Sequence, residues 1–219
     1  MKNHIRNLLK KISRRALAVL PRKPKAQSLT EFAIALPILL ILLSGVVEYG
    51  FALNYYLSLL DATRESARYY SKFDPFLYDS NRNIVGDNSL FYEGAAGMVI
   101  NNLDPTQDPE FKDEPYIGRI IPLNSTTDEV IITVYSKSNS GVLSYPAAGS
   151  FRLYASDTES LFTNEEVGGL FENNTPDAGL LIVEVHFTYN AVMNLPWLAP
   201  LFPMELRAYT IMPLPAADP

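Results

Sequence analysis

The sequence contains no cysteine and only two histidines among its 219 residues. Without cysteine there can be no disulfide bond, zinc ribbon or thiol catalysis. His4 lies in a basic amino-terminal stretch, and His186 falls on the polar side of a predicted strand, where a histidine is most often a solvated surface residue. No serine or aspartate spacing around His186 indicates a catalytic triad. We therefore expect no enzyme activity, no cofactor and no small-molecule substrate.

A metal site is not expected either. Residues 79–90 begin like a calcium loop, with oxygen-bearing side chains at alternate positions. Ile84 stands where such a loop needs glycine, and Leu90 stands where it needs a bidentate glutamate. The segment therefore reads as an ordinary polar loop.

Positive charge is concentrated at the start of the chain. Residues 1–26 hold nine of the 18 Lys and Arg residues and no acidic residue. Residues 27–219 then carry nine basic against 24 acidic side chains, a formal net charge of −15. Because a phosphate-binding surface needs its positive charge on the folded domain, nucleic acid is not expected as a partner.

Residues 32–53 form a long apolar run, FAIALPILLILLSGVVEYGFAL, in which Glu48 is the one acidic or basic residue. A bilayer core of about 30 Å takes about 20 helical residues, so this run predicts a membrane span. A buried helix of a soluble core would show a polar face over this length, and a signal peptide has an apolar stretch of only about 7 to 15 residues. Nine basic residues precede the run and three follow within twenty residues, which predicts a cytoplasmic amino terminus and an extracytoplasmic remainder.

The helical pattern continues beyond the span. Apolar residues recur at three- and four-residue steps, which predicts a face covered by other elements: Leu53, Tyr56, Leu57, Leu60, Ala67 and Tyr70. Asp61 with Arg64, and Glu65 with Arg68, form charge pairs three residues apart on the other face. We expect one helix from about Phe32 to Tyr70, roughly 58 Å long at 1.5 Å per residue.

The remaining residues predict a small α+β domain with an antiparallel sheet. Residues 129–135, 181–189 and 204–212 have strand patterns, and the middle one alternates apolar residues with Glu184, His186 and Thr188, which we expect to face solvent. A short helix is expected around 88–102. Capping-box patterns at Ser156 and Thr163 predict another near 157–171, ended by Gly168 and Gly169.

Three motifs lie in order along the amino-terminal helix. Residues 26–32 read AQSLTEF between a basic leader and the apolar run, residues 47–50 read VEYG, and residues 61–70 read DATRESARYY. Together they resemble the TadE-like minor pseudopilins of tight-adherence pilus systems, within the type IV prepilin superfamily. The residues that carry the last two motifs are Glu48, Tyr49, Gly50, Ala62, Arg64, Glu65, Ala67 and Arg68.

This resemblance implies cleavage by a prepilin peptidase between Ala26 and Gln27, which makes Glu31 the fifth residue of the mature chain. Glu31 and Phe32 are then assembly residues, with Glu31 pairing the new amino terminus of this subunit or a neighbour. A carboxylate at the entrance of a span needs such a partner, or solvation among the headgroups. For Glu48 we favour a position at the membrane interface beside Tyr49.

The resemblance also implies the organisation of the chain. Residues 1–26 are a cytoplasmic leader, 27–73 the TadE-like helix and 74–219 an extracytoplasmic domain. The expected partners are the lipid bilayer of a bacterial cytoplasmic membrane, other pilins or pseudopilins, and the prepilin peptidase. A membrane-anchored binding module is the alternative, and an anchored enzyme is the third.

The link between the last two predicted strands, residues 194–203, contains three prolines and several large apolar residues. Proline stiffens the link and removes hydrogen-bond donors. Trp197 and Phe202 therefore either pack on the sheet or form an exposed patch that contacts another pilus component.

Overall fold

The computed structural model of the protein describes residues 24–108, 120–138, 141–147, 149–154, 158–173 and 179–217. Residues 1–23 of the predicted leader 1–26 lie outside these ranges, and the side chains of residues 24–27 are not described. The chain divides into two compact units, of which the first ends at Val46 and the second begins at Val47.

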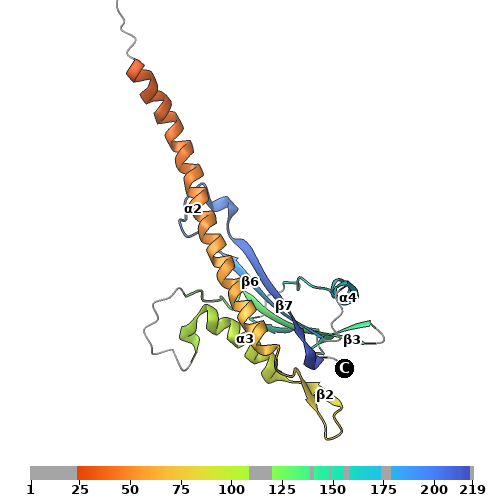
Figure 1. Cartoon of the computed structure of the whole chain (residues 1–219). Coiled ribbons are helices and arrows are strands. Elements are labelled where there is room, and N and C mark those ends of the chain that lie inside the picture. Colours follow the sequence, from red (N-terminus) through yellow and green to blue (C-terminus); the bar gives the residue numbers. More distant parts are fainter. Residues whose placement is uncertain are drawn as a thin grey trace, which may run out of the picture. The chain divides into compact units, whose positions relative to one another are not determined.

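Helix α2, Pro24–Tyr70, is unbroken and covers the predicted TadE-like helix 27–73 except its last three residues, and Pro37 lies inside it (Figure 1). In the first unit its large apolar side chains are exposed, including Leu29, Phe32, Ile34, Leu39 and Leu42. Among the described residues this is the one helix long and apolar enough to cross a membrane. The predicted continuous helix is confirmed, and it begins earlier than Phe32.

The second unit is built on a five-stranded antiparallel sheet, which confirms the α+β prediction (Figure 1). Four strands follow the order β4-β3-β6-β7, and the fifth, β5, pairs with β3 beside β4. The three predicted strands are its long members: β3 (Glu129–Ser138), β6 (Gly179–Tyr189) and β7 (Met204–Leu214). Two short strands share the outer edge of β3, namely β4 (Gly141–Tyr145) and β5 (Phe151–Leu153).

The described residues also form several smaller elements. A separate two-stranded sheet pairs β1 (Phe76–Tyr78) with β2 (Ile84–Asp87). The helix expected around 88–102 is confirmed as α3 (Ser89–Leu103). Short 3-10 helices occupy Pro105–Gln107, Ala199–Leu201 and Pro215–Ala217.

One face of the sheet packs against α3 and the part of α2 in the second unit. Small residues of α2, such as Ala52, Ala62 and Ala67, are buried in this core. Ser66 donates a hydrogen bond to the carbonyl of Ala95 at 2.7 Å, which fixes α2 to α3. The apolar pattern was wrong about Leu53 and Leu57, which are exposed. The covered face instead carries Leu59 together with small residues, which let two backbones approach closely.

The other face of the sheet is covered by α4 (Asn164–Asn173) and by residues 158–162. The capping box at Thr163 is confirmed, since the Glu166 carboxylate accepts from the Thr163 N–H at 2.9 Å and Thr163 Oγ1 accepts from the Glu166 N–H at 3.3 Å. Ser156, the other predicted cap, lies outside the described residues, and the helix begins at Asn164 instead of near residue 157. The prediction that Gly168 and Gly169 end this helix was wrong. Both lie inside α4, where burial of neighbouring apolar side chains outweighs a cost of about 1 kcal/mol per glycine.

The polar face of β6 is buried, contrary to the expectation that it faces solvent. Glu184 and His186 are each 1% exposed. The Glu184 carboxylate accepts from Ser160 Oγ at 2.5 Å and from the Leu161 N–H at 2.8 Å, and His186 Nδ1 lies 3.1 Å from Thr158 Oγ1. Residues 158–162 therefore fold over the strand and hydrogen-bond the groups that the alternation assigned to solvent.

Candidate functional site on the long helix

Glu48 is 2% exposed and holds the connection between β6 and β7 against α2. Its carboxylate accepts three hydrogen bonds, from Tyr189 Oη at 2.6 Å, from the Val192 N–H at 2.7 Å and from the Met193 N–H at 3.0 Å. The Glu48 carboxylate is therefore hydrogen-bonded within the protein, whereas its neighbour Tyr49 is exposed. We call Glu48 with these three donors the Glu48 site.

Local packing fixes the phenol of Tyr189, at the end of β6. Its ring meets the Tyr55 ring at a centroid distance of 5.1 Å and the Phe202 ring at 5.7 Å, both edge to face. Burial, and then the hydrogen bond to Glu48, raise the pKa of Tyr189, so its hydroxyl keeps the proton that it donates. Sequence reasoning could not find this site, because 141 residues separate Glu48 from Tyr189.

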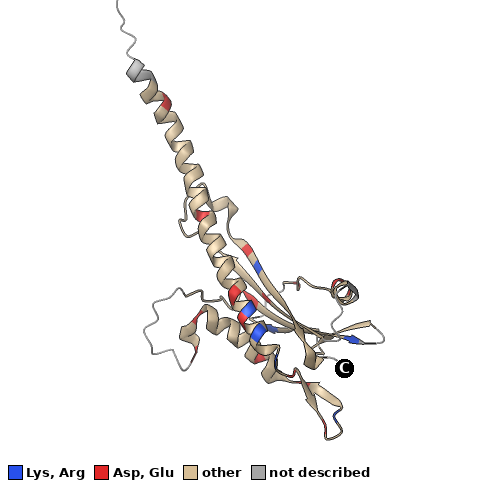
Figure 2. Ribbon diagram, viewed as in Figure 1, with Lys and Arg blue, Asp and Glu red and all other residues tan. Residues whose placement is uncertain are grey.

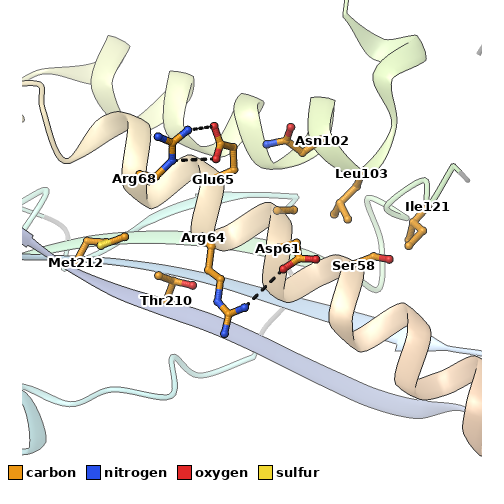
Figure 3. A pocket seen from close by; sticks show the side chains of 11 residues that line it. Ser58, Asp61, Arg64, Glu65, Arg68, Asn102, Leu103, Ile121, Thr210 and Met212 are labelled. Carbon is orange, nitrogen blue, oxygen red and sulfur yellow. Dashed lines mark hydrogen bonds and ion pairs between the residues drawn. The ribbon is translucent and has the colours of Figure 1, made fainter. Parts of the chain in front are cut away.

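A groove of about 880 Å³ runs along α2 in the second unit (Figure 3). One wall is the helix itself, and α3 and β7 contribute to the others. The residues that line it are Ser58, Asp61, Ala62, Arg64, Glu65, Arg68, Asn102, Leu103, Ile121, Thr210 and Met212. The groove therefore brings four predicted motif residues, Ala62, Arg64, Glu65 and Arg68, to one surface.

Two intrachain ion pairs dominate the electrostatics of the groove. Arg64 lies 3.6 Å from the Asp61 carboxylate, and Arg68 lies 2.6 Å from that of Glu65. The hydrogen bonds from Arg68 lower the pKa of Glu65, and those same bonds raise the pKa of Arg68. All four side chains are well exposed, so the pairs add little to stability, and Figure 2 shows these charges gathered in the carboxy-terminal part of α2.

The structure separates the remaining predicted residues. Glu31 and Phe32 are exposed on the first unit, and Gly50 is exposed with open space around it. Ala26 and Gln27 lie in α2, but their side chains are outside the description.

Of the predicted contact patch, Phe202 packs against the core as a half-buried ring, whereas Trp197 is 47% exposed. Within the described ranges, no three His, Asp or Glu side chains are grouped so as to hold a metal ion.

Comparison with known proteins bears on the long helix. Residues 26–68 match the family described as TadE-like protein. The TadE-like segment therefore covers most of α2, including the exposed apolar part, Glu48 and the helical wall of the groove. This confirms the resemblance and points to tight-adherence pilus systems. Searches of the curated proteins and of the solved structures found no match.

Proposed function

We propose that the protein is a membrane-anchored minor pseudopilin that takes part in assembling a tight-adherence pilus or a related secretion system. The observation that carries this proposal is the TadE-like match on a helix whose amino-terminal part exposes its apolar side chains. Such a surface is stable only against lipid or against other apolar helices. Its partners are then the bilayer and the helices of other pilins or pseudopilins.

Residues 26–32 give the helix its proposed processing and assembly roles. A prepilin peptidase cuts between Ala26 and Gln27 on the cytoplasmic side, and Glu31 becomes the fifth residue of the mature chain. Glu31 pairs with the amino terminus of this subunit or its neighbour and sets the register of packed helices. The domain after the span is extracytoplasmic, and the protein has no catalytic role.

The assembly role is tested by Glu31→Ala in the full-length protein. We expect unchanged membrane insertion, measured by resistance to carbonate extraction, together with reduced pilus formation and reduced co-purification of other pilins. Glu93→Ala is the matched control, because Glu93 is an exposed glutamate on α3. Unchanged pilus formation with Glu31→Ala would count against the proposal.

A membrane-anchored binding module is a second candidate, and the groove favours it. In that case α2 serves only as an anchor up to Val47, and the groove holds a ligand. Replacing residues 1–47 with an unrelated single span separates the two functions while leaving Glu48 in place. We expect this replacement to abolish pilus assembly, whereas a binding module would keep its function. Arg64→Ala together with Arg68→Ala would impair the module alone.

A further inference from the structure

We propose that the connection between β6 and β7, residues 190–203, is a second membrane contact, which inserts into the interfacial layer of the bilayer on the side where residues 47–219 lie. We call this segment the interfacial loop. Four observations carry the proposal: its composition, its exposed side chains, its position along α2 and its internal hydrogen bonds.

The composition of the interfacial loop suits lipid. It reads NAVMNLPWLAPLFP, with no acidic or basic residue and with the chain's single tryptophan. Its exposed large apolar side chains are Val192, Met193, Trp197 and Leu201. Four such side chains within ten residues form a patch, whereas exposed apolar residues on a water-facing loop are usually scattered.

The Glu48 site fixes the depth of the loop. Glu48 accepts hydrogen bonds from the backbone N–H groups of Val192 and Met193, so these residues lie at the level of Glu48 along α2. About 20 helical residues cross the hydrocarbon core, and a span that starts at Phe32 ends near Phe51. Glu48 is therefore close to the boundary between hydrocarbon and headgroups, and the loop lies at that same boundary. Tyr49 and Phe51, both exposed, add aromatic rings at this level, where tryptophan and tyrosine are enriched in membrane proteins.

Several backbone N–H groups of the loop already have hydrogen-bond acceptors within the protein, which suits a poorly hydrated layer. The Leu198 N–H bonds the Leu195 carbonyl at 2.9 Å, the Leu201 N–H bonds the Leu198 carbonyl at 2.9 Å, and the Phe202 N–H bonds the Ala199 carbonyl at 3.2 Å. The three prolines have no N–H group. Val192 and Met193 are bonded to Glu48, and the Ala199 N–H bonds the Leu195 carbonyl at 3.1 Å, so at least six of the eleven backbone N–H groups of the loop have an acceptor within the protein. These six groups lose no hydrogen bond to water on insertion, which lowers the cost of contact with lipid.

The same patch fits a lipid surface better than a neighbouring pilin. The loop has no charge with which to recognise a protein partner, and its level along α2 places it where lipid is the surrounding medium. The inference does not depend on pilus assembly.

Trp197 provides the test, because it is the only tryptophan of the full-length protein. The protein is reconstituted alone, at about one molecule per vesicle, into phosphatidylcholine and phosphatidylglycerol vesicles brominated at acyl carbons 6 and 7 or at carbons 11 and 12. We expect strong quenching of Trp197 by the shallow bromines, weaker quenching by the deep ones, and little access for acrylamide. Absent quenching in both lipids would overturn the proposal. Quenching that appears only at high protein density would also overturn it, since the loop would then contact a second copy.

A matched pair of variants shows whether the patch itself makes the contact. Leu201→Asp introduces a negative charge at a side chain that is 67% exposed, and Leu90→Asp does so on α3 at one that is 76% exposed. Neither replaces a buried group, so both should fold. We expect Leu201→Asp to reduce the quenching of Trp197 about twofold or more, because a carboxylate resists insertion and is repelled by the anionic lipid, and Leu90→Asp to leave it unchanged. Equal quenching in the two variants would contradict the proposal.

Discussion

Replacing Glu48 by glutamine tests the Glu48 site with almost no change of shape. In the structure, Oε1 accepts from Tyr189 and from the Val192 N–H, while Oε2 accepts from the Met193 N–H. Glutamine offers one carbonyl oxygen and one NH₂ group, which only donates. In one orientation the NH₂ group faces the Met193 N–H, and in the other it faces the Val192 N–H. Either way, one backbone donor loses its acceptor.

The expected loss of free energy follows from the single backbone donor that is left without an acceptor. An unsatisfied buried donor costs about 1–3 kcal/mol, and hydrogen bonds to a charged acceptor are worth about 1 kcal/mol more than neutral ones. We expect Glu48→Gln to destabilise the attachment of the interfacial loop by about 2–4 kcal/mol. At about 1.4 kcal/mol per factor of ten, the detached state becomes roughly 30 to 1,000 times more populated.

Hydrogen exchange of the full-length protein in lipid nanodiscs measures this change. We expect the amides of Val192 and Met193 to exchange faster by that factor, while the amides in the middle of β6 keep their protection. Glu65→Gln is the control, because the Glu65–Arg68 pair is exposed and adds little to stability. If Val192 and Met193 exchange no faster in Glu48→Gln than in Glu65→Gln, the account of this site is refuted.

Three further predictions concern the second unit. In denaturant titrations, Gly97→Ala should raise the free energy of unfolding by about 1 kcal/mol, since a Cβ at this helical position meets open space. Gly94→Ala should give no such gain, because its Cβ would displace the Tyr70 ring from Phe91. Glu184→Ala should lower the free energy of unfolding by about 2–4 kcal/mol in the same titrations, and should speed amide exchange at 158–162, because Ser160 and Leu161 lose their acceptor. A decrease below about 0.5 kcal/mol would indicate the solvated strand face that the alternation predicted. Burial alone would raise the pKa of Asp104, but hydrogen bonds from Thr106 and Gln107 outweigh burial and lower that pKa. The ionised Asp104 carboxylate therefore stabilises the fold at pH values above its ordinary pKa, and this contribution is lost as the pH falls through the lowered pKa. Thermal unfolding should accordingly show Asp104→Asn less stable than the wild type at neutral pH, with the difference shrinking in acid, and a constant difference would contradict this.

Local patterns were enough to predict much of the fold. The apolar run and the steps of three and four residues predicted α2, because both properties are local to one helix. The strands at 129–135, 181–189 and 204–212 were found for the same reason, and the spacing of Thr163 and Glu166 predicted the capping box. Strands β4 and β5 were missed because they are short and gain their order by pairing with β3.

The parts that could not be predicted depend on contacts between distant segments. Alternation along β6 shows that the strand has two different faces, but it does not show that residues 158–162 cover the polar one. Glu48 carries no local sign that Tyr189 and Val192 supply its donors. The groove likewise depends on α3 and β7 meeting α2, although its charged residues on α2 were predicted as a motif.

The mass of the mature chain, purified from membranes of cells with and without the prepilin peptidase, tests the central claim most directly. A pseudopilin of this class is expected to begin at Gln27 where the peptidase is present and to keep its basic leader where the peptidase is absent. A chain that begins at Met1 in both cells would contradict the account.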